Sequence, residues 1–562
     1  TDGTAFGALL KSGTGVLTLV GPNTHSGGTV VSSGTLVAGA VGSLGTGAVT
    51  LENGGTLTLA APQGSLASFG GSGTGWTLNG GATAAGDVLT VTTALGSQAR
   101  SAFYNRRVST DPFTISFTYN ASQGGTNPAD GLTMVFQNDD RETKAIGNSG
   151  GDMGYADLQG GVGIRPSAGL AINLYPSGSL GIGSSLLQGG NRVGYTTATG
   201  INVYETPVDV RLVYNGSALT ATLTQGAATF TKTYENVNLA DLVGKAAYLG
   251  FTGGTGGCVA LQTISNFHYD TTVPVATAFD NNVLLNAGAN ANVTLLADAA
   301  THDYRLGNLA IGSGATLNLA TETGSATNQA YSLAVGTTTL AGPATFNVAN
   351  NGAGQGSLVL GSLQDGGSAR TITKTGAGAL TLAASAASLV HGTQVNVAAG
   401  TLNSNHATAL GTLAQVNVAS GATLAVGASQ TLGSLTGRGT VALHGNTLTV
   451  GSTNNLPSSF LGSFADGSAP GVLRKAGAGT LTVAGSSTHS GQTIVSAGKL
   501  LVGSSDALGT SQITLGNGTT LALAAPVTSM AGFGNDGTAW TFNGGSSAAA
   551  DVLTVTTNEG SL

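Results

Sequence analysis

Charged residues and cysteine are scarce in this sequence, and both shortages exclude classes of protein. Lysine and arginine together number 18 and aspartate and glutamate 25, so only 8% of the 562 residues are charged, against about 25% in an average protein. The net charge of -7 argues against a surface that binds nucleic acid or anionic membrane. The single cysteine, Cys258, excludes an internal disulfide and a cysteine-rich zinc site.

Long apolar runs are also missing. No stretch reaches the roughly 18 apolar residues that a membrane-spanning helix needs, so we expect no membrane insertion in this segment. Glycine is abundant, with 92 residues, beside 12 prolines and a hydrophobic fraction of 41%. Glycine does not recur at every third position, which excludes collagen, and the hydrophobic fraction is too high for a charged, disordered chain.

A long internal repeat organises the chain. Residues 1–98 align without a gap on residues 465–562, at a constant offset of 464 residues, and more than half of the aligned positions are identical. Lys11 falls on Lys475 and His25 on His489. We therefore expect the chain to start and stop inside a repeating array, without a signal peptide of its own. Its partners would be neighbouring repeats, or identical chains stacked end to end.

Short apolar triplets recur about every 20 residues outside the segment 69–272. Strands this short cannot stand alone, but similar rungs can stack, with turns at glycine and asparagine. We predict an all-β chain with a right-handed parallel β-solenoid over residues 1–68 and 273–532, and few helices, because no 3.6-residue apolar period is sustained. The triplets centre on three leucine columns: Leu17, Leu36 and Leu57; Leu380, Leu402 and Leu424; Leu481, Leu500 and Leu521.

Residues 69–272 differ in composition, since they carry 10 of the 18 basic residues and most of the aromatics. Apolar and polar residues alternate at a period of two between glycine and asparagine turns, as in 113–119, FTISFTY. This pattern predicts an antiparallel β-sandwich inserted into the solenoid. Residues 533–562 repeat the opening of this segment, so we predict that a second sandwich begins there.

Recurrent lysine-glycine motifs carry a family resemblance. Residues 11–19 (KSGTGVLTL), 24–29 (THSGGT), 374–382 (KTGAGALTL) and 475–483 (KAGAGTLTV) resemble the passenger-associated repeat of bacterial autotransporter adhesins. The resemblance implies an extracellular β-helix displayed at the bacterial cell surface.

Residues 69–272 resemble the L-type, concanavalin-like lectin domains, most specifically at 129–137 (ADGLTMVFQ), and also at 169–175 and 247–257. The resemblance implies a jelly-roll sandwich that binds sugar among loops at one end. Asp130 would accept hydrogen bonds from sugar hydroxyls; a turn-capping carboxylate is the alternative reading. The other carbohydrate-binding positions that it implies are the backbone donors Gly150 and Gly151, the amide of Asn191, and a late loop of Thr252, Gly253, Gly254 and Thr255.

A calcium ion is a further implication of the resemblance. The family usually has aspartate two residues before its central aromatic residue, whereas this chain has Asn173 before Tyr175. Any calcium site would use Asn173, Tyr175 and Asp152 and be weaker than is usual, because calcium prefers several carboxylate oxygens. A solvated acidic loop is the alternative. The acidic residues that could substitute are Asp139, Asp140, Glu142 and Asp157.

Catalytic patterns are missing from the sequence. A glycosidase needs two facing carboxylates, and no alternating acidic run occurs; His25 and His489 stand in turns without an acidic neighbour. We therefore predict a protein that is not an enzyme: an extracellular adhesin whose solenoid presents lectin modules to glycans on a cell surface or matrix. The alternative is a purely structural fibre, sheath or surface-layer protein, with the sandwich as spacer or lateral docking module.

Overall fold

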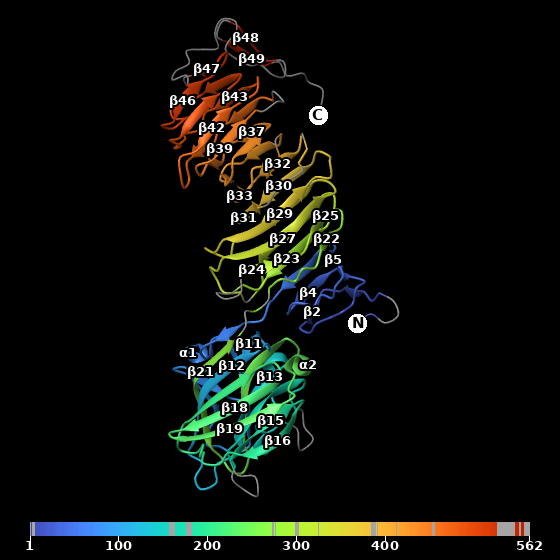
Figure 1. Cartoon of the computed structure of the whole chain (residues 1–562), viewed down its shortest axis with the longest axis vertical. Coiled ribbons are helices and arrows are strands. Elements are labelled where there is room, and N and C mark those ends of the chain that lie inside the picture. Colours follow the sequence, from blue (N-terminus) through green and yellow to red (C-terminus); the bar gives the residue numbers. More distant parts are fainter. Residues whose placement is uncertain are drawn as a thin grey trace. The chain divides into compact units, whose positions relative to one another are not determined.

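The computed structural model (Figure 1) describes two compact units, Thr1–Gly411 and Thr412–Leu562. Among the described residues, helical structure is limited to α1 (Gly70–Gly73), α2 (Leu239–Val243) and two short 3-10 turns, so the predicted all-β class is confirmed. The described residues are 2, 6–156, 163–175, 182–272, 275, 277–297, 303–323, 325–383, 389–390, 392–411, 413–451 and 456–524, and the strand backbones of 546–549 and 552–555.

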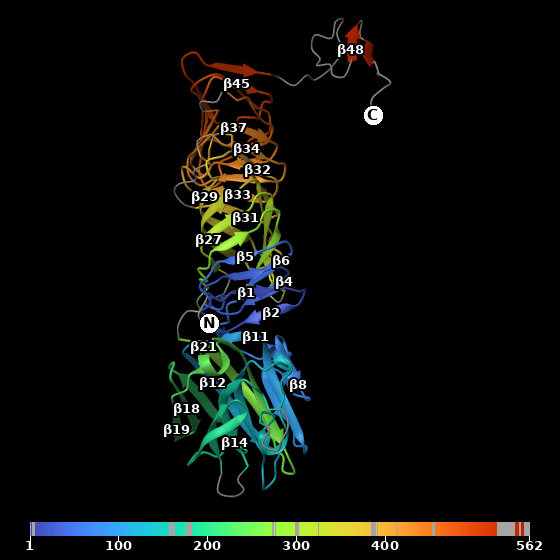
Figure 2. The ribbon, with the colours of Figure 1, turned by 90° about the vertical axis from the view of Figure 1, so that its right-hand side faces the viewer.

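In the first unit, the predicted leucine column forms the inside of a parallel β-solenoid. Leu17 pairs with Leu36, and Leu36 with Leu57, and the last two side chains are fully buried. Figure 2 shows these rungs stacked one on the next. One solenoid sheet begins with β2 (Val16–Leu19), β4 (Gly34–Ala38) and β6 (Gly55–Leu59), and the other with β1 (Leu9–Lys11), β3 (Thr29–Val31) and β5 (Val49–Leu51).

The sandwich is inserted between two consecutive rungs. Strand β22 (Val283–Leu285) pairs with β5, and β23 (Asn290–Leu295) pairs with β6. Val293 therefore stacks on Leu57, although 236 residues separate them. The apolar column of the solenoid thus continues across the insertion.

The next rungs are longer than predicted. Paired residues here lie 25 to 29 positions apart, as in Tyr331 with Gly356 and Ala315 with Ala344, so the spacing of about 20 residues is wrong for this stretch. Stacked amides support these rungs, because Asn318 donates to Asn292 and Asn347 donates to Asn318, at 3.1 and 2.9 Å. The strands of the stretch are β24 (Asp303–Arg305), β25 (Leu309–Ile311), β26 (Ala315–Thr321), β27 (Tyr331–Leu340), β28 (Ala344–Val348), β29 (Gly356–Gln364), β30 (Thr371–Thr375), β31 (Ala379–Leu382), β32 (Gln394–Val397) and β33 (Thr401–Ser404).

The second unit is again a parallel solenoid, in which Leu481 pairs with Leu500 and Leu500 with Leu521. Of the predicted second sandwich, only the backbone of hairpin β48 and β49 is described; Ser547 pairs there with Thr554, as Thr83 pairs with Thr90 one period earlier. The strands of this unit are β34 (Gln415–Val418), β35 (Thr423–Val426), β36 (Gln430–Leu432), β37 (Ser434–Gly437), β38 (Thr440–Ala442), β39 (Thr447–Val450), β40 (Ser458–Phe460), β41 (Ser463–Ala465), β42 (Val472–Lys475), β43 (Thr480–Val483), β44 (Gln492–Val495), β45 (Lys499–Val502), β46 (Gln512–Leu515), β47 (Thr520–Leu523), β48 (Ser546–Ala549) and β49 (Val552–Val555).

The predicted sandwich consists of two antiparallel sheets. One has the order β16-β15-β14-β13-β20-β11-β8 and the other β19-β18-β17-β12-β21-β10-β9, and aromatic side chains such as Phe113, Phe136 and Phe251 fill the space between them. The strands are β7 (Ser65–Leu66), β8 (Trp76–Asn79), β9 (Thr83–Ala85), β10 (Val88–Thr92), β11 (Gln98–Ser109), β12 (Phe113–Ser122), β13 (Gly131–Gln137), β14 (Ser167–Asn173), β15 (Gly183–Gln188), β16 (Asn191–Thr197), β17 (Val208–Tyr214), β18 (Ala218–Gln225), β19 (Ala228–Glu235), β20 (Ala246–Thr255) and β21 (Leu261–Thr271).

The motif lysines of the solenoid are buried, and each ammonium group binds backbone carbonyls of two rungs. Lys374 Nζ donates to the carbonyls of Thr375 (2.6 Å) and Gly376 (2.8 Å) in its own turn and of Ala399 (3.2 Å) one rung later. Lys11 and Lys475 make the corresponding three contacts. The lysine therefore joins the turns of successive rungs, and burial lowers the pKa of Lys374 to about 8.

The two turn histidines also occupy equivalent places, one period apart. Nε2 of His25 lies 2.9 Å from Thr29 Oγ1, and Nε2 of His489 lies 3.1 Å from Thr493 Oγ1. His489 is fully buried, and its Nδ1 has no hydrogen-bond partner among the described residues. A proton on Nδ1 would therefore place an unpaired charge in the interior.

We predict that His489 makes the second unit less stable in mild acid. Burial lowers the pKa of His489, while Asp466 acts in the opposite direction. Because the folded-state pKa is below the ordinary value of about 6.5, the unfolded chain binds more protons, so stability present above that pH is lost as pH falls below it. Urea midpoints measured between pH 7 and pH 5 should fall less steeply in His489→Gln than in the wild type. An unchanged slope would refute this role, and exposed His268→Gln is the control.

Candidate functional site

The backbone of Asp130 is held at one end of the sandwich by two neighbouring strands. It directly precedes β13 and follows a cis peptide bond with Ala129. Its N–H donates to the carbonyl of Gly254 on β20 (3.1 Å), and its carbonyl accepts from the N–H groups of Leu174 (2.9 Å) and Tyr175 (3.3 Å), just past β14. These contacts fix where the carboxyl group points.

The carboxyl group of Asp130 is an unused acceptor. Only 8% of the residue is exposed, yet Oδ2 has no hydrogen-bond partner among the described residues. Burial raises the pKa of Asp130 to about 6, against the opposing effects of the Gly256 N–H and of Arg192. Buried polar atoms are almost always hydrogen-bonded, so an unpaired carboxylate oxygen at the end of a sandwich indicates a place for a donor from outside the chain.

Glycines keep the space around this oxygen open. A Cβ atom on Gly150 would lie 4.0 Å from Asp130 Oδ2, and one on Gly256 would lie 3.5 Å from it, so a larger side chain at either position would enter the space next to the carboxylate. Gly254 allows the loop to approach, because its Cβ would come within 2.8 Å of the Gly150 carbonyl. Nothing lies within 4 Å of a Cβ on Gly151.

The other predicted sugar contacts have different surroundings. Thr252 is buried and donates to the Met153 carbonyl at 2.6 Å. Thr255 is buried and donates to the Leu95 carbonyl, also at 2.6 Å. A Cβ on Gly253 would come within 2.6 Å of the Val91 side chain. These three positions support the end of β20 from inside. Asn191 is exposed at the start of β16, and no described contact joins it to Asp130.

Arg192, which the sequence did not single out, belongs to this group. It is half-buried on β16, and its positive charge acts on both Asp152 and Asp130. Its Nη1 lies 3.9 Å from Met153 Sδ. Neighbouring residues of a strand point to opposite faces, so Arg192 lies over the site whereas Asn191 does not. The scarcity of charge in the chain was the one signal that could have suggested it.

The predicted calcium ligands do not fit a calcium ion. The side-chain amide of Asn173 donates to the Tyr175 carbonyl at 2.8 Å, and a second hydrogen bond joins Asn173 to Tyr195. Asp152 is buried, accepts from Asn148 (3.3 Å) and faces a guanidinium group. Calcium takes six to eight oxygen ligands, and within the described residues no three His, Cys, Asp or Glu side chains gather as metal ligands.

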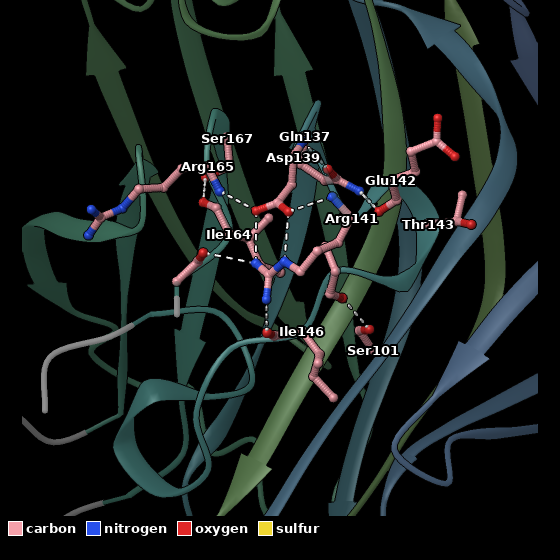
Figure 3. Close-up of polar contacts among 12 residues, drawn as sticks. Ser101, Gln137, Asp139, Arg141, Glu142, Thr143, Ile146, Ile164, Arg165 and Ser167 are labelled. Carbon is pink, nitrogen blue, oxygen red and sulfur yellow. Dashed lines mark hydrogen bonds and ion pairs between the residues drawn. The ribbon is translucent and has the colours of Figure 1, made fainter. Parts of the chain in front are cut away.

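The nearby acidic residues have other roles. Figure 3 shows Asp139 between the Arg141 side chain and the backbone of Arg165. Its two oxygens accept from Arg141 Nε (2.7 Å) and Nη2 (2.8 Å), and Oδ2 also accepts from the Arg165 N–H (2.9 Å). Burial alone would raise the pKa of Asp139, but these hydrogen bonds lower it. Asp140 and Glu142 are exposed, and Asp157 lies outside the described residues.

Comparison with known families concerns the solenoid. Residues 9–38, 372–403 and 473–502 match the model of the passenger-associated-transport repeat, and each match contains one of the buried lysines described above. The chain is autotransporter-like. Its passenger repeats imply a secreted passenger, and no helix among the described residues is long and apolar enough to cross a membrane.

The sandwich of this autotransporter-like chain is similar to solved plant lectins. Lectin II from Ulex europaeus is 15% identical, with 37% of this chain and 97% of that chain covered and a TM-score of 0.32. A lectin from Bauhinia forficata in complex with GalNAc is 18% identical, with 37% and 96% covered and a TM-score of 0.32. The metal-free form of lectin I-B4 from Griffonia simplicifolia is 15% identical, with 37% and 98% covered and a TM-score of 0.31.

Proposed function

We propose that this chain is a segment of an adhesin at the bacterial cell surface, in which the sandwich binds glycans of a cell surface or matrix next to Asp130. The solenoid presents the sandwich, and the 464-residue repeat would multiply the number of binding sites. Multivalent display can raise avidity by about 10²–10⁴ without new contacts.

One observation carries the proposal: the buried, unpaired Oδ2 of Asp130 beside Gly150 and Gly256. A sugar presents several hydroxyl donors, and a charged acceptor binds them about twice as strongly as a neutral one. The absence of side chains on the two glycines leaves room for a ring close to the backbone. The resemblance of residues 129–137 to L-type lectins supports the same assignment.

The site favours binding over catalysis. A glycosidase needs two carboxyl groups that flank the scissile bond. The second carboxylate here, Asp152, accepts a hydrogen bond from Asn148 and faces the charge of Arg192. We therefore propose that the sandwich retains the glycan without cleaving it.

A glycan array tests the proposal. The full chain, coupled to fluorescent beads so that weak binding is multiplied, is applied to printed glycans at neutral pH, both with added calcium and with a chelator. We expect binding to at least one class of glycan, and its loss in beads that carry Asp130→Asn. Wild-type beads that bind no glycan in either buffer would overturn the proposal.

A further inference from the structure

We propose that Arg192 supplies the fixed positive charge of this site, so that the sandwich positions Asp130 and binds its glycan without calcium. The part that concerns glycans rests on the function proposed above. The part that concerns calcium does not, because it can be measured on the protein alone.

Two buried carboxylates create the need for a cation. Asp130 is 8% exposed and Asp152 is 4% exposed, and the turn Gly150–Asp152 places both at the same end of the sandwich. Burying carboxylates is costly unless a positive charge compensates them. Arg192 is the cation that acts on both groups.

The hairpin that carries Arg192 is short and well defined. Gln188 pairs with Asn191, and Leu187 pairs with Arg192. The two residues of the turn, Gly189 and Gly190, both have positive φ, 54° and 83°, as the favoured two-residue turns require. A strand joined by so tight a turn holds its side chains at fixed positions, so the guanidinium charge is part of the folded sandwich.

The groups that calcium would use are occupied. Asn173 donates to the Tyr175 carbonyl and also bonds Tyr195. The backbone N–H groups of Leu174 and Tyr175 hold the Asp130 carbonyl directly, so the loop is tied to Asp130 without a bridging ion. A guanidinium group keeps its charge at every pH at which proteins fold. It therefore supplies permanently a charge that a bound ion supplies only at sufficient concentration.

Calorimetry and thermal melting of the full wild-type chain test the calcium part. After treatment with a chelator and dialysis, we expect no heat on titration with calcium chloride, and the same melting temperature in calcium and in chelator. A stoichiometric heat, or a melting temperature that rises by several degrees with calcium, would overturn the proposal. These readouts stand even if the array finds no glycan.

Variants test the role of Arg192 itself. We expect Arg192→Met to lower the melting temperature of the sandwich and, where a glycan has been found, to weaken its binding at least tenfold. Arg192→Lys keeps the charge and should lie between the two. Arg211→Met removes an exposed arginine from β17, in the other sheet, and is the matched control. If Arg192→Met behaves as Arg211→Met does, or if chelator abolishes glycan binding by the wild type, the proposal is wrong.

Discussion

Replacement of Asp130 by asparagine is expected to weaken glycan binding about ten- to hundredfold, because a hydrogen bond to a charged group contributes about 1.5–3 kcal/mol. The same change should leave the sandwich at least as stable as the wild type. Its carboxylate is buried with an oxygen that no described residue satisfies, so removal of the charge also removes a desolvation cost. Lost affinity without lost stability separates a binding residue from a turn cap, whose removal would destabilise the fold.

Surface-based binding measurements and thermal melts of the full chain are suited to this comparison. Asp140→Asn removes an exposed carboxylate from the same sandwich and should change neither affinity nor melting temperature. The account of Asp130 would be contradicted if Asp130→Asn bound as tightly as Asp140→Asn. It would also be contradicted if Asp130→Asn melted well below the wild type, since the carboxylate would then support the fold.

The second large effect is expected at Lys374. Lys374→Met keeps a chain of similar length in the interior but removes three hydrogen bonds to the carbonyls of Thr375, Gly376 and Ala399. Unmet acceptors cost about 1–3 kcal/mol each when fully buried. These carbonyls are partly buried, and the methionine avoids the cost of burying an ammonium group, so we expect a net loss of about 2–3 kcal/mol.

Hydrogen exchange is the appropriate readout, because solenoids open locally, rung by rung. Peptides from β30 and β33 should exchange about 30- to 150-fold faster in Lys374→Met, if exchange reports the local opening equilibrium. Lys499→Met, which alters an exposed lysine on β45, should change local stability by less than about 0.5 kcal/mol. Equal exchange in the two variants would show that the buried ammonium group does not join the rungs.

The solenoid could be predicted from sequence where one column of side chains repeats. Leu17, Leu36 and Leu57 stack in register because each is the central apolar residue of its strand. The same reasoning missed the rungs of 25 to 29 residues, whose longer strands and asparagine ladder break the spacing. The role of the motif lysines was also hidden, because one of the carbonyls that each binds belongs to the next rung.

The candidate site was only partly predictable, for a similar reason. Asp130 stands in a motif that is specific in sequence, and Gly150 and Gly254 follow in loops that the lectin resemblance marks. Arg192 belongs to no local pattern; its place depends on how the β15–β16 hairpin lies beside the turn Gly150–Asp152. Asn191, its neighbour in sequence, is exposed. Sequence spacing alone cannot assign one of two adjacent residues to a site when the strand and its turn are not yet fixed.

A crystal structure of the full chain with the best glycan from the array would test the central claim most directly. The account predicts a sugar hydroxyl within hydrogen-bond distance of Asp130 Oδ2, beside Gly150 and Gly256, with no metal ion between them. A glycan bound elsewhere on the chain, with Oδ2 still unpaired, would contradict it.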